Sequence, residues 1–145
     1  MVGALVMSLP LAPAWAAWTD VVPVSGTAIS AHVVSRPASA ACTPLLLAAT
    51  VTWPDVDPRY DYEVTLRQSN GSQVGATRSV TSSSPSTTYT GLVDFGLSSL
   101  SSGTFDYTVE IRSYLTVNAG WRSAEARSVA LQVSKVLGLS AIVSC

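Results

Sequence analysis

The fold is decided by the stretch Gly103-Thr104-Phe105-Asp106-Tyr107-Thr108-Val109-Glu110-Ile111-Arg112-Ser113. Its apolar residues at 105, 107, 109 and 111 alternate with polar residues at 106, 108, 110 and 112. A period of two is typical of a strand with one face in the core and the other in water. The segments before and after it are expected to be its neighbours in an antiparallel sandwich.

The composition favours an extracellular all-β domain over a cytosolic enzyme. A chain of 145 residues is long enough for one domain. Hydrophobic residues make up 48% of the chain. Charged residues make up only 12%, well below the share of about 25% in typical soluble domains. The net charge of −1 provides no basic surface for nucleic acid. Seven arginines against one lysine indicate a bacterial genome rich in G and C.

About seven strands are predicted, with turn signals between them and no helical period longer than one turn. The strand that begins at residue 103 is expected to run on towards residue 117. The other predicted strands are residues 29–34, 49–53, 60–66, 73–80, 88–95 and 121–133. Residues 38–44 are predicted as a connection, Asn70-Gly71 as a hairpin turn and residues 118–120 as another turn. Tyr89, Val93 and Phe95 are expected in the core.

The first residues have the pattern of an export signal. Residues 1–16 carry no charge, are too short to span a bilayer, and end in Ala14-Trp15-Ala16, a small-x-small cleavage pattern. The alternative is a buried N-terminal strand or helix. We therefore expect a signal peptide over 1–16, an N-terminal arm and first strand over 17–44, and a sandwich body with an apolar tail over 45–145.

The residues around this cleavage site carry a resemblance to a known group. Ala14-Trp15-Ala16-Ala17-Trp18-Thr19-Asp20, followed by the strand-like residues 24–29, resembles exported proteins with a SipW-type signal peptide, the TasA/camelysin-like group. The resemblance implies cleavage after Ala16, export, and a place at the cell surface or in the extracellular matrix. It also implies that the arm over 17–34 can complete the sandwich of another subunit, whereas the alternative is that the arm forms its own chain's first strand.

Three further motifs resemble a fibronectin type III or related immunoglobulin-like domain over residues 45–133. They are Val51-Thr52-Trp53-Pro54, Tyr62-Glu63-Val64, and Leu100-Ser101-Ser102-Gly103-Thr104 followed by 107–111. The resemblance implies that Trp53 is a core residue and that Tyr107 is a corner tyrosine that bonds back to the backbone. One extra residue between Thr104 and Tyr107 and a longer segment over 91–99 depart from the family pattern.

Two cysteines, Cys42 and Cys145, allow one intramolecular disulfide. Export would place both thiols in an oxidising compartment. The connection expected to carry Cys42 would lie at the same end of the sandwich as the exit of the last strand. We therefore predict a Cys42–Cys145 disulfide that pins the apolar tail to the body.

The candidate binding residues are Tyr60, Tyr114 and Trp121, because the loops over 54–59 and 117–120 meet at one end of the resembled fold. The alternative is that Tyr114 and Trp121 pack on strand edges. Asp55, Asp57 and Asp61 could hold calcium, and the alternative is a turn whose aspartates cap their own backbone.

No motif indicates catalysis. The single histidine, His32, has no Gly-x-Ser-x-Gly elbow or His-Glu-x-x-His helix around it. We expect no enzyme activity, no catalytic or metal residues and no cofactor. The expected function is a secreted structural or fibre-forming protein whose partners are its own copies or surface and matrix components, with no nucleic acid and no membrane after cleavage. The alternative is a monomeric recognition module that uses the loop end.

Overall fold

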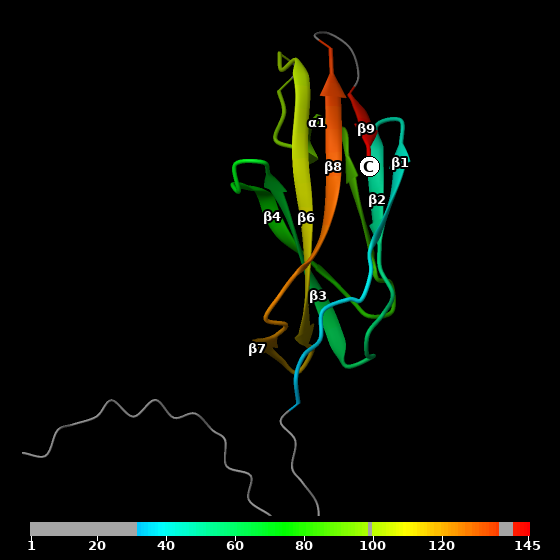
Figure 1. Cartoon of the computed structure of the whole chain (residues 1–145), viewed down its shortest axis with the longest axis vertical. Helices are drawn as coiled ribbons and strands as arrows, with labels where there is room; N and C mark the ends of the chain where they lie inside the picture. The colour runs from blue at the N-terminus through cyan, green and yellow to red at the C-terminus, as the bar shows by residue number, and fades with distance from the viewer. Residues whose placement is uncertain (1–31, 99, 137–140) are drawn as a thin grey trace, which may run out of the picture. The chain divides into compact units, whose positions relative to one another are not determined.

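The computed structural model describes residues 32–98, 100–136 and 141–145, so the predicted signal peptide and most of the arm lie outside the described residues. The chain divides into two units, 1–32 and 33–145, and the second is an all-β antiparallel sandwich compatible with an immunoglobulin-like fold. Its described part contains nine strands and one short helix, shown in Figure 1. They are β1 (Ala41–Leu45), β2 (Ala48–Thr52), β3 (Tyr60–Gln68), β4 (Gln73–Val80), β5 (Ser86–Thr90), α1 (Gly91–Asp94), β6 (Gly103–Leu115), β7 (Asn118–Arg122), β8 (Arg127–Lys135) and β9 (Ile142–Ser144).

The strands form two sheets. The smaller sheet has the order β1-β2-β5, and the larger has the order β4-β3-β6-β8-β9, with β7 paired to β6. Residues 103–113, the stretch with the clearest alternation, lie in β6. This strand pairs along most of its length with β3 on one side and β8 on the other. Its alternation therefore places one set of side chains against the smaller sheet and the other set in solvent.

The core lies between the sheets and is built by the predicted alternation. Tyr62, Val64 and Leu66 of β3 are buried, as predicted. Val109 and Ile111 of the neighbouring strand β6 are fully buried beside them in the same sheet. Trp53 directly follows β2 and packs edge-on against Tyr62 with 5.4 Å between the ring centroids, which confirms its expected place in the core.

Tyr107 makes the bond that the family resemblance implies. Its hydroxyl donates to the carbonyl oxygen of Phe95, twelve residues upstream, at 2.8 Å. Burial raises the pKa of this hydroxyl, which keeps it protonated and able to donate. The bond fixes the segment between α1 and β6 against the start of the central strand.

Two regions differ from the predicted strand positions. The first strand in the described chain is β1, at 41–45, where a connection was expected over 38–44. Of the strand expected over 29–34, residues 32–34 form no strand and residues 29–31 lie outside the described residues. The boundary expected between 44 and 45 therefore falls inside β1. The strand expected over 121–133 is two strands, β7 and β8, separated by residues 123–126, and the turn expected at 118–120 belongs to β7.

The segment expected as a strand over 88–95 ends early. Strand β5 stops at Thr90, and the chain turns through Gly91, whose φ of 63° favours glycine, into the helical turn α1. Tyr89 and Phe95 are buried as predicted, but Val93 is 90% exposed on α1, so its predicted place in the core is wrong. Strict alternation fails here because a helical turn rotates side chains by a different angle than a strand does.

The predicted disulfide between Cys42 and Cys145 is present, with Cα atoms 5.9 Å apart. Cys42 lies in β1 and Cys145 directly follows β9, so the bond joins an edge strand of each sheet. In Figure 1, β9 lies between β8 and the β1–β2 hairpin. The side chains of Ala141 and Val143, just before and within β9, are buried in the hydrophobic core. Structural disulfides are typical of proteins from oxidising compartments.

On the opposite side of the sandwich, Arg78 of β4 connects the larger sheet to β5 of the smaller sheet. Its Nη1 atom donates to the carbonyl oxygen of Thr88 at 2.6 Å, and its Nη2 atom lies 2.9 Å from Asp94 Oδ1 of α1. Its guanidinium carbon lies 4.2 Å from the ring centroid of Tyr89, a cation–π geometry. One half-buried arginine therefore ties together β4, β5 and α1.

Candidate functional site

The three aromatic residues predicted as a binding surface do not share one face of the sandwich. Tyr60 is only 3% exposed and lies on the inner face of β3. Asp61, which follows it, is opposite Tyr114 in the strand register, so Tyr60 and Tyr114 lie on opposite faces of the larger sheet. The prediction of Tyr60 as a surface residue is therefore wrong. Tyr114 is half-buried and Trp121 is 54% exposed, and their role in binding stays a prediction.

The aspartates considered for calcium are engaged in the turn after β2. Asp57 Oδ1 accepts hydrogen bonds from the Arg59 backbone N and Nε, both at 2.9 Å. Asp55 Oδ1 accepts from the Tyr62 hydroxyl at 2.6 Å. Burial, and then this bond to Asp55, raise the pKa of Tyr62. Asp61 accepts from the Ser82 backbone N at 3.3 Å. Asp57 therefore caps the backbone of its own turn, as the alternative interpretation expects, whereas Asp61 lies in β3 and holds the loop after β4.

His32 is exposed at the beginning of the described chain, outside both cavities described below. Within residues 32–98, 100–136 and 141–145, no three His, Cys, Asp or Glu side chains are grouped so that they could hold a metal ion.

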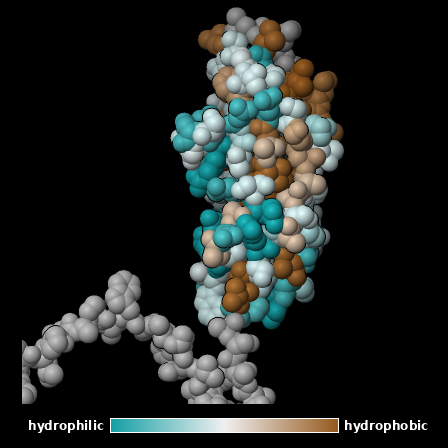
Figure 2. Space-filling model, viewed as in Figure 1, coloured by the Kyte–Doolittle hydropathy of each residue, from teal (hydrophilic) through white to brown (hydrophobic). Residues whose placement is uncertain are grey.

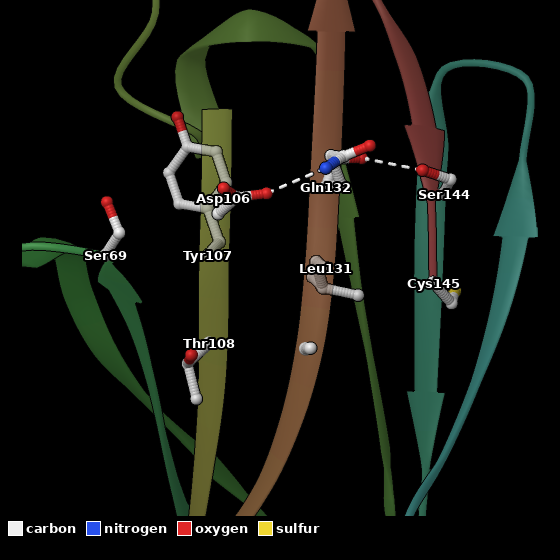
Figure 3. A pocket seen from close by; sticks show the side chains of 9 residues that line it. Ser69, Asp106, Tyr107, Thr108, Leu131, Gln132, Ser144 and Cys145 are labelled. Atoms are coloured by element: carbon white, nitrogen blue, oxygen red, sulfur yellow. Dashed lines mark hydrogen bonds between the residues drawn. The ribbon is translucent and has the colours of Figure 1, made fainter. Parts of the chain in front are cut away.

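The larger of the two cavities, about 410 Å³, opens at the outer face of β6, β8 and β9. Figure 3 shows Asp106, Gln132 and Ser144 in a row across these three strands. The Gln132 amide donates to Asp106 Oδ1 at 2.9 Å, and the Ser144 hydroxyl donates to the Gln132 carbonyl oxygen at 3.4 Å. Ala130 and Thr108 also line this cavity. Its hydroxyl, amide and carboxylate groups can form hydrogen bonds to a polar ligand.

A smaller cavity of about 180 Å³ lies on the same face, over β3, β6 and β4. Its charged residues pair with one another: Arg67 Nε lies 2.9 Å from Glu110 Oε2, and Arg122 Nη1 lies 3.0 Å from Glu63 Oε2. The fifth, Arg112, donates to the carbonyl oxygen of Ala124 at 2.9 Å. The charged side chains of this cavity are therefore engaged with one another or with the backbone.

The outer face of the smaller sheet has a very different character. Register and alternation place nine side chains outward in three cross-strand rows, which we call the threonine face. The rows are Ala41–Thr52–Ser86, Thr43–Thr50–Thr88 and Leu45–Ala48–Thr90. Eight of the nine are exposed or half-buried, and none is charged. The hydroxyl oxygens of Thr50 and Thr88 lie 2.9 Å apart at its centre.

An apolar hairpin adjoins this face. Leu45, Leu46 and Leu47, which we call the leucine hairpin, form the end of β1 and the turn into β2, and Leu46 is 75% exposed. The hairpin is held in place because the Gly91 backbone N donates to the Leu47 carbonyl oxygen at 3.0 Å. Ile142 of β9 and Val136 are also exposed. Figure 2 shows apolar surface gathered at the end of the sandwich where this hairpin and β9 lie. The sequence prediction missed this surface.

Signals for the threonine face are present in the sequence. Thr50-Val51-Thr52 and Thr88-Tyr89-Thr90 each carry a buried residue between two threonines, and residues 38–54 and 79–93 contain no charge. What the sequence lacks is the pairing that places the two motifs side by side.

Comparisons with known proteins give no family for this chain: no family model matches it, and no curated protein matches it significantly. Among the helices of the described residues, none is long and apolar enough to cross a membrane.

Proposed function

We propose that this chain is a secreted structural protein of the cell surface or extracellular matrix, whose subunits associate with one another. The observation that carries the proposal is the surface made by the threonine face and the leucine hairpin, which lacks charge and exposes leucines. Charged residues are depleted at the centres of protein–protein interfaces, and this surface has none.

Export and fold family belong to the same proposal. The Ala14-Trp15-Ala16 motif supports cleavage after residue 16, and a disulfide between edge strands supports an oxidising destination. A fibronectin type III-like arrangement is supported by the split into sheets of three and six strands, the buried Trp53 and the Tyr107 bond to Phe95.

The test is the size of the mature protein in solution and on a grid. The exported chain is expected to begin at Ala17 by intact mass and to show concentration-dependent assembly by analytical ultracentrifugation, with ordered assemblies in electron micrographs of secreted material. A protein that remains a sharp monomer at the highest attainable concentration would contradict the structural role.

The alternative proposal is a monomeric recognition module. The observation that favours it is the open polar cavity across β6, β8 and β9, together with the exposed Trp121 of β7. A monomer that binds cell-surface or matrix components, with binding weakened by Gln132→Ala, would replace the first proposal by this one.

A further inference from the structure

We propose that the threonine face is a self-docking interface: the outer face of β1-β2-β5 packs against the same face of a second copy of this chain. The inference rests on the proposed function, since it names the surface and the partner through which the subunits associate.

The first argument is the division of charge between the two outer faces. The outer face of the larger sheet carries seven charged side chains, namely Asp61, Glu63, Arg67, Asp106, Glu110, Arg112 and Arg122. The threonine face carries none. A two-fold interface brings each residue near its own copy or near symmetry-related neighbours, so a charged face tends to bring like charges together. A face without charge avoids this repulsion and is complementary to itself.

The second argument concerns the hydroxyl groups. Five threonines and one serine occupy the nine positions of the face. A hydroxyl can donate one hydrogen bond and accept two, so identical faces can satisfy each other. Thr50 and Thr88 already pair with each other, but a lipid surface would offer no partner to the other hydroxyls, which costs free energy in an apolar medium. A second copy is therefore the occupant that matches both the lack of charge and the hydroxyls.

The third argument concerns the area of the threonine face, which limits how tightly two copies can bind. Strands about 4.8 Å apart with about 3.4 Å per residue give the three five-residue strands an area of roughly 250 Å². A stable interface usually buries about 800 Å² on each partner. The leucine hairpin extends the surface along its edge, but the pairing remains small. We therefore expect reversible association that becomes extensive only at high local concentration, as in a matrix.

The test places a charge at the centre of the face in the full disulfide-bonded chain. Thr50 lies in the middle row of the middle strand, so Thr50→Arg brings two arginines together at a two-fold interface. Analytical ultracentrifugation is expected to show association at least tenfold weaker than in the wild type. The matched control is Thr104→Arg, an exposed threonine on the outer face of the larger sheet whose hydroxyl lies 3.5 Å from that of Ser134, and this variant is expected to associate like the wild type.

Mixing the Thr50→Arg and Thr50→Glu variants in equal amounts is expected to restore association, because opposite charges then meet across the interface. If Thr50→Arg does not fold, the exposed Thr88→Arg variant serves in its place. Wild-type association that Thr50→Arg or Thr88→Arg leaves unchanged, or that Thr104→Arg weakens equally, would overturn this interface while leaving the proposed function in place. A wild type that never associates would overturn both.

Discussion

The two sides of the sandwich are closed by different chemistry. On one side, a disulfide joins Cys42 of β1 to Cys145 after β9, across a sequence separation of 103 residues. On the other side, Arg78 of β4 bonds to Thr88 of β5, only ten residues away, and to Asp94 of α1. The covalent bond lies where the two ends of the domain meet, and the ionic contact lies where the chain itself already connects the strands.

The difference follows from the entropy of closing loops. A cross-link between distant residues removes more freedom from the unfolded chain than one between residues that a short loop already holds together. The five residues 81–85 limit how far β4 and β5 can separate, so a reversible contact is enough there. β9 has three residues and pairs only with β8, so it depends on the disulfide and on Ala141 and Val143 in the core.

Breaking the disulfide side is expected to have the largest effect. Replacing both cysteines by serine should lower the free energy of unfolding by up to about 4.7 kcal/mol, the chain-entropy figure for a loop of about 100 residues. Denaturant unfolding of the oxidised wild type and the double variant measures it, and β9 amides should lose protection from hydrogen exchange first. Reductant should destabilise the wild type but not the double variant. A loss below about 1 kcal/mol would mean that unfolded-state entropy is not what this bond controls.

Breaking the arginine side is expected to cost less. Arg78→Met keeps the aliphatic stem but removes the bonds to Thr88 and Asp94 and the contact with Tyr89. We expect a loss of about 2 kcal/mol in the free energy of unfolding, because one hydrogen bond to a charged group contributes about 1.5–3 kcal/mol and solvent screens the ion pair of a side chain that is 33% exposed. The matched control is Arg67→Met, which breaks an ion pair on one sheet's outer face and should cost under about 1 kcal/mol. Equal losses in the two variants would show that Arg78 has no special role between the sheets.

Removing the Tyr89 hydroxyl, which lies beside Arg78, is expected to change the free energy of unfolding least at neutral pH. Its hydroxyl is buried and has no hydrogen-bond partner among the described residues. Tyr89→Phe should therefore leave stability unchanged or raise it by up to about 1 kcal/mol, because an unsatisfied buried group costs free energy.

At alkaline pH the same variant should diverge from the wild type. Burial raises the pKa of Tyr89 from 10.0 to about 12. The unfolded chain ionises first, so the contribution of Tyr89 is fully present below pH 10 and is lost as the pH rises from about 10 to 12. Tyr62 and Tyr107 are the same in both proteins, so unfolding curves at pH 8 and pH 11 isolate the difference. An unchanged difference between these two pH values would contradict it.

Much of the fold could be predicted from the sequence because strand alternation is local. The period of two over 103–113 identifies β6 and its buried face, and Tyr62, Val64 and Leu66 do the same for β3. Asn70-Gly71 specifies the β3–β4 hairpin, and Gly71 has the φ of 83° that such a turn requires. With two cysteines and an expected oxidising compartment, the disulfide followed by count.

The candidate surfaces could not be predicted in the same way. Alternation over 60–66 shows that Tyr60 shares a face with Tyr62, yet the loop location of its neighbours suggested an exposed role. Thr50 and Thr88 are 38 residues apart, and only the register of β2 with β5 places their hydroxyls together. The exposure of the leucine hairpin likewise depends on what packs over the end of the sandwich.

The sequence by itself determined the strands β2, β3, β4 and β6 to within a few residues, which of their side chains share a face, and that the two cysteines can pair. The tertiary structure decided which faces are covered, that β1 begins only at residue 41, and that Arg78 rather than a second cross-link closes the side between β4 and β5. The physical reason is that strand periodicity is set by the backbone within a few residues. Burial and charge partners depend instead on pairings between segments far apart in the chain.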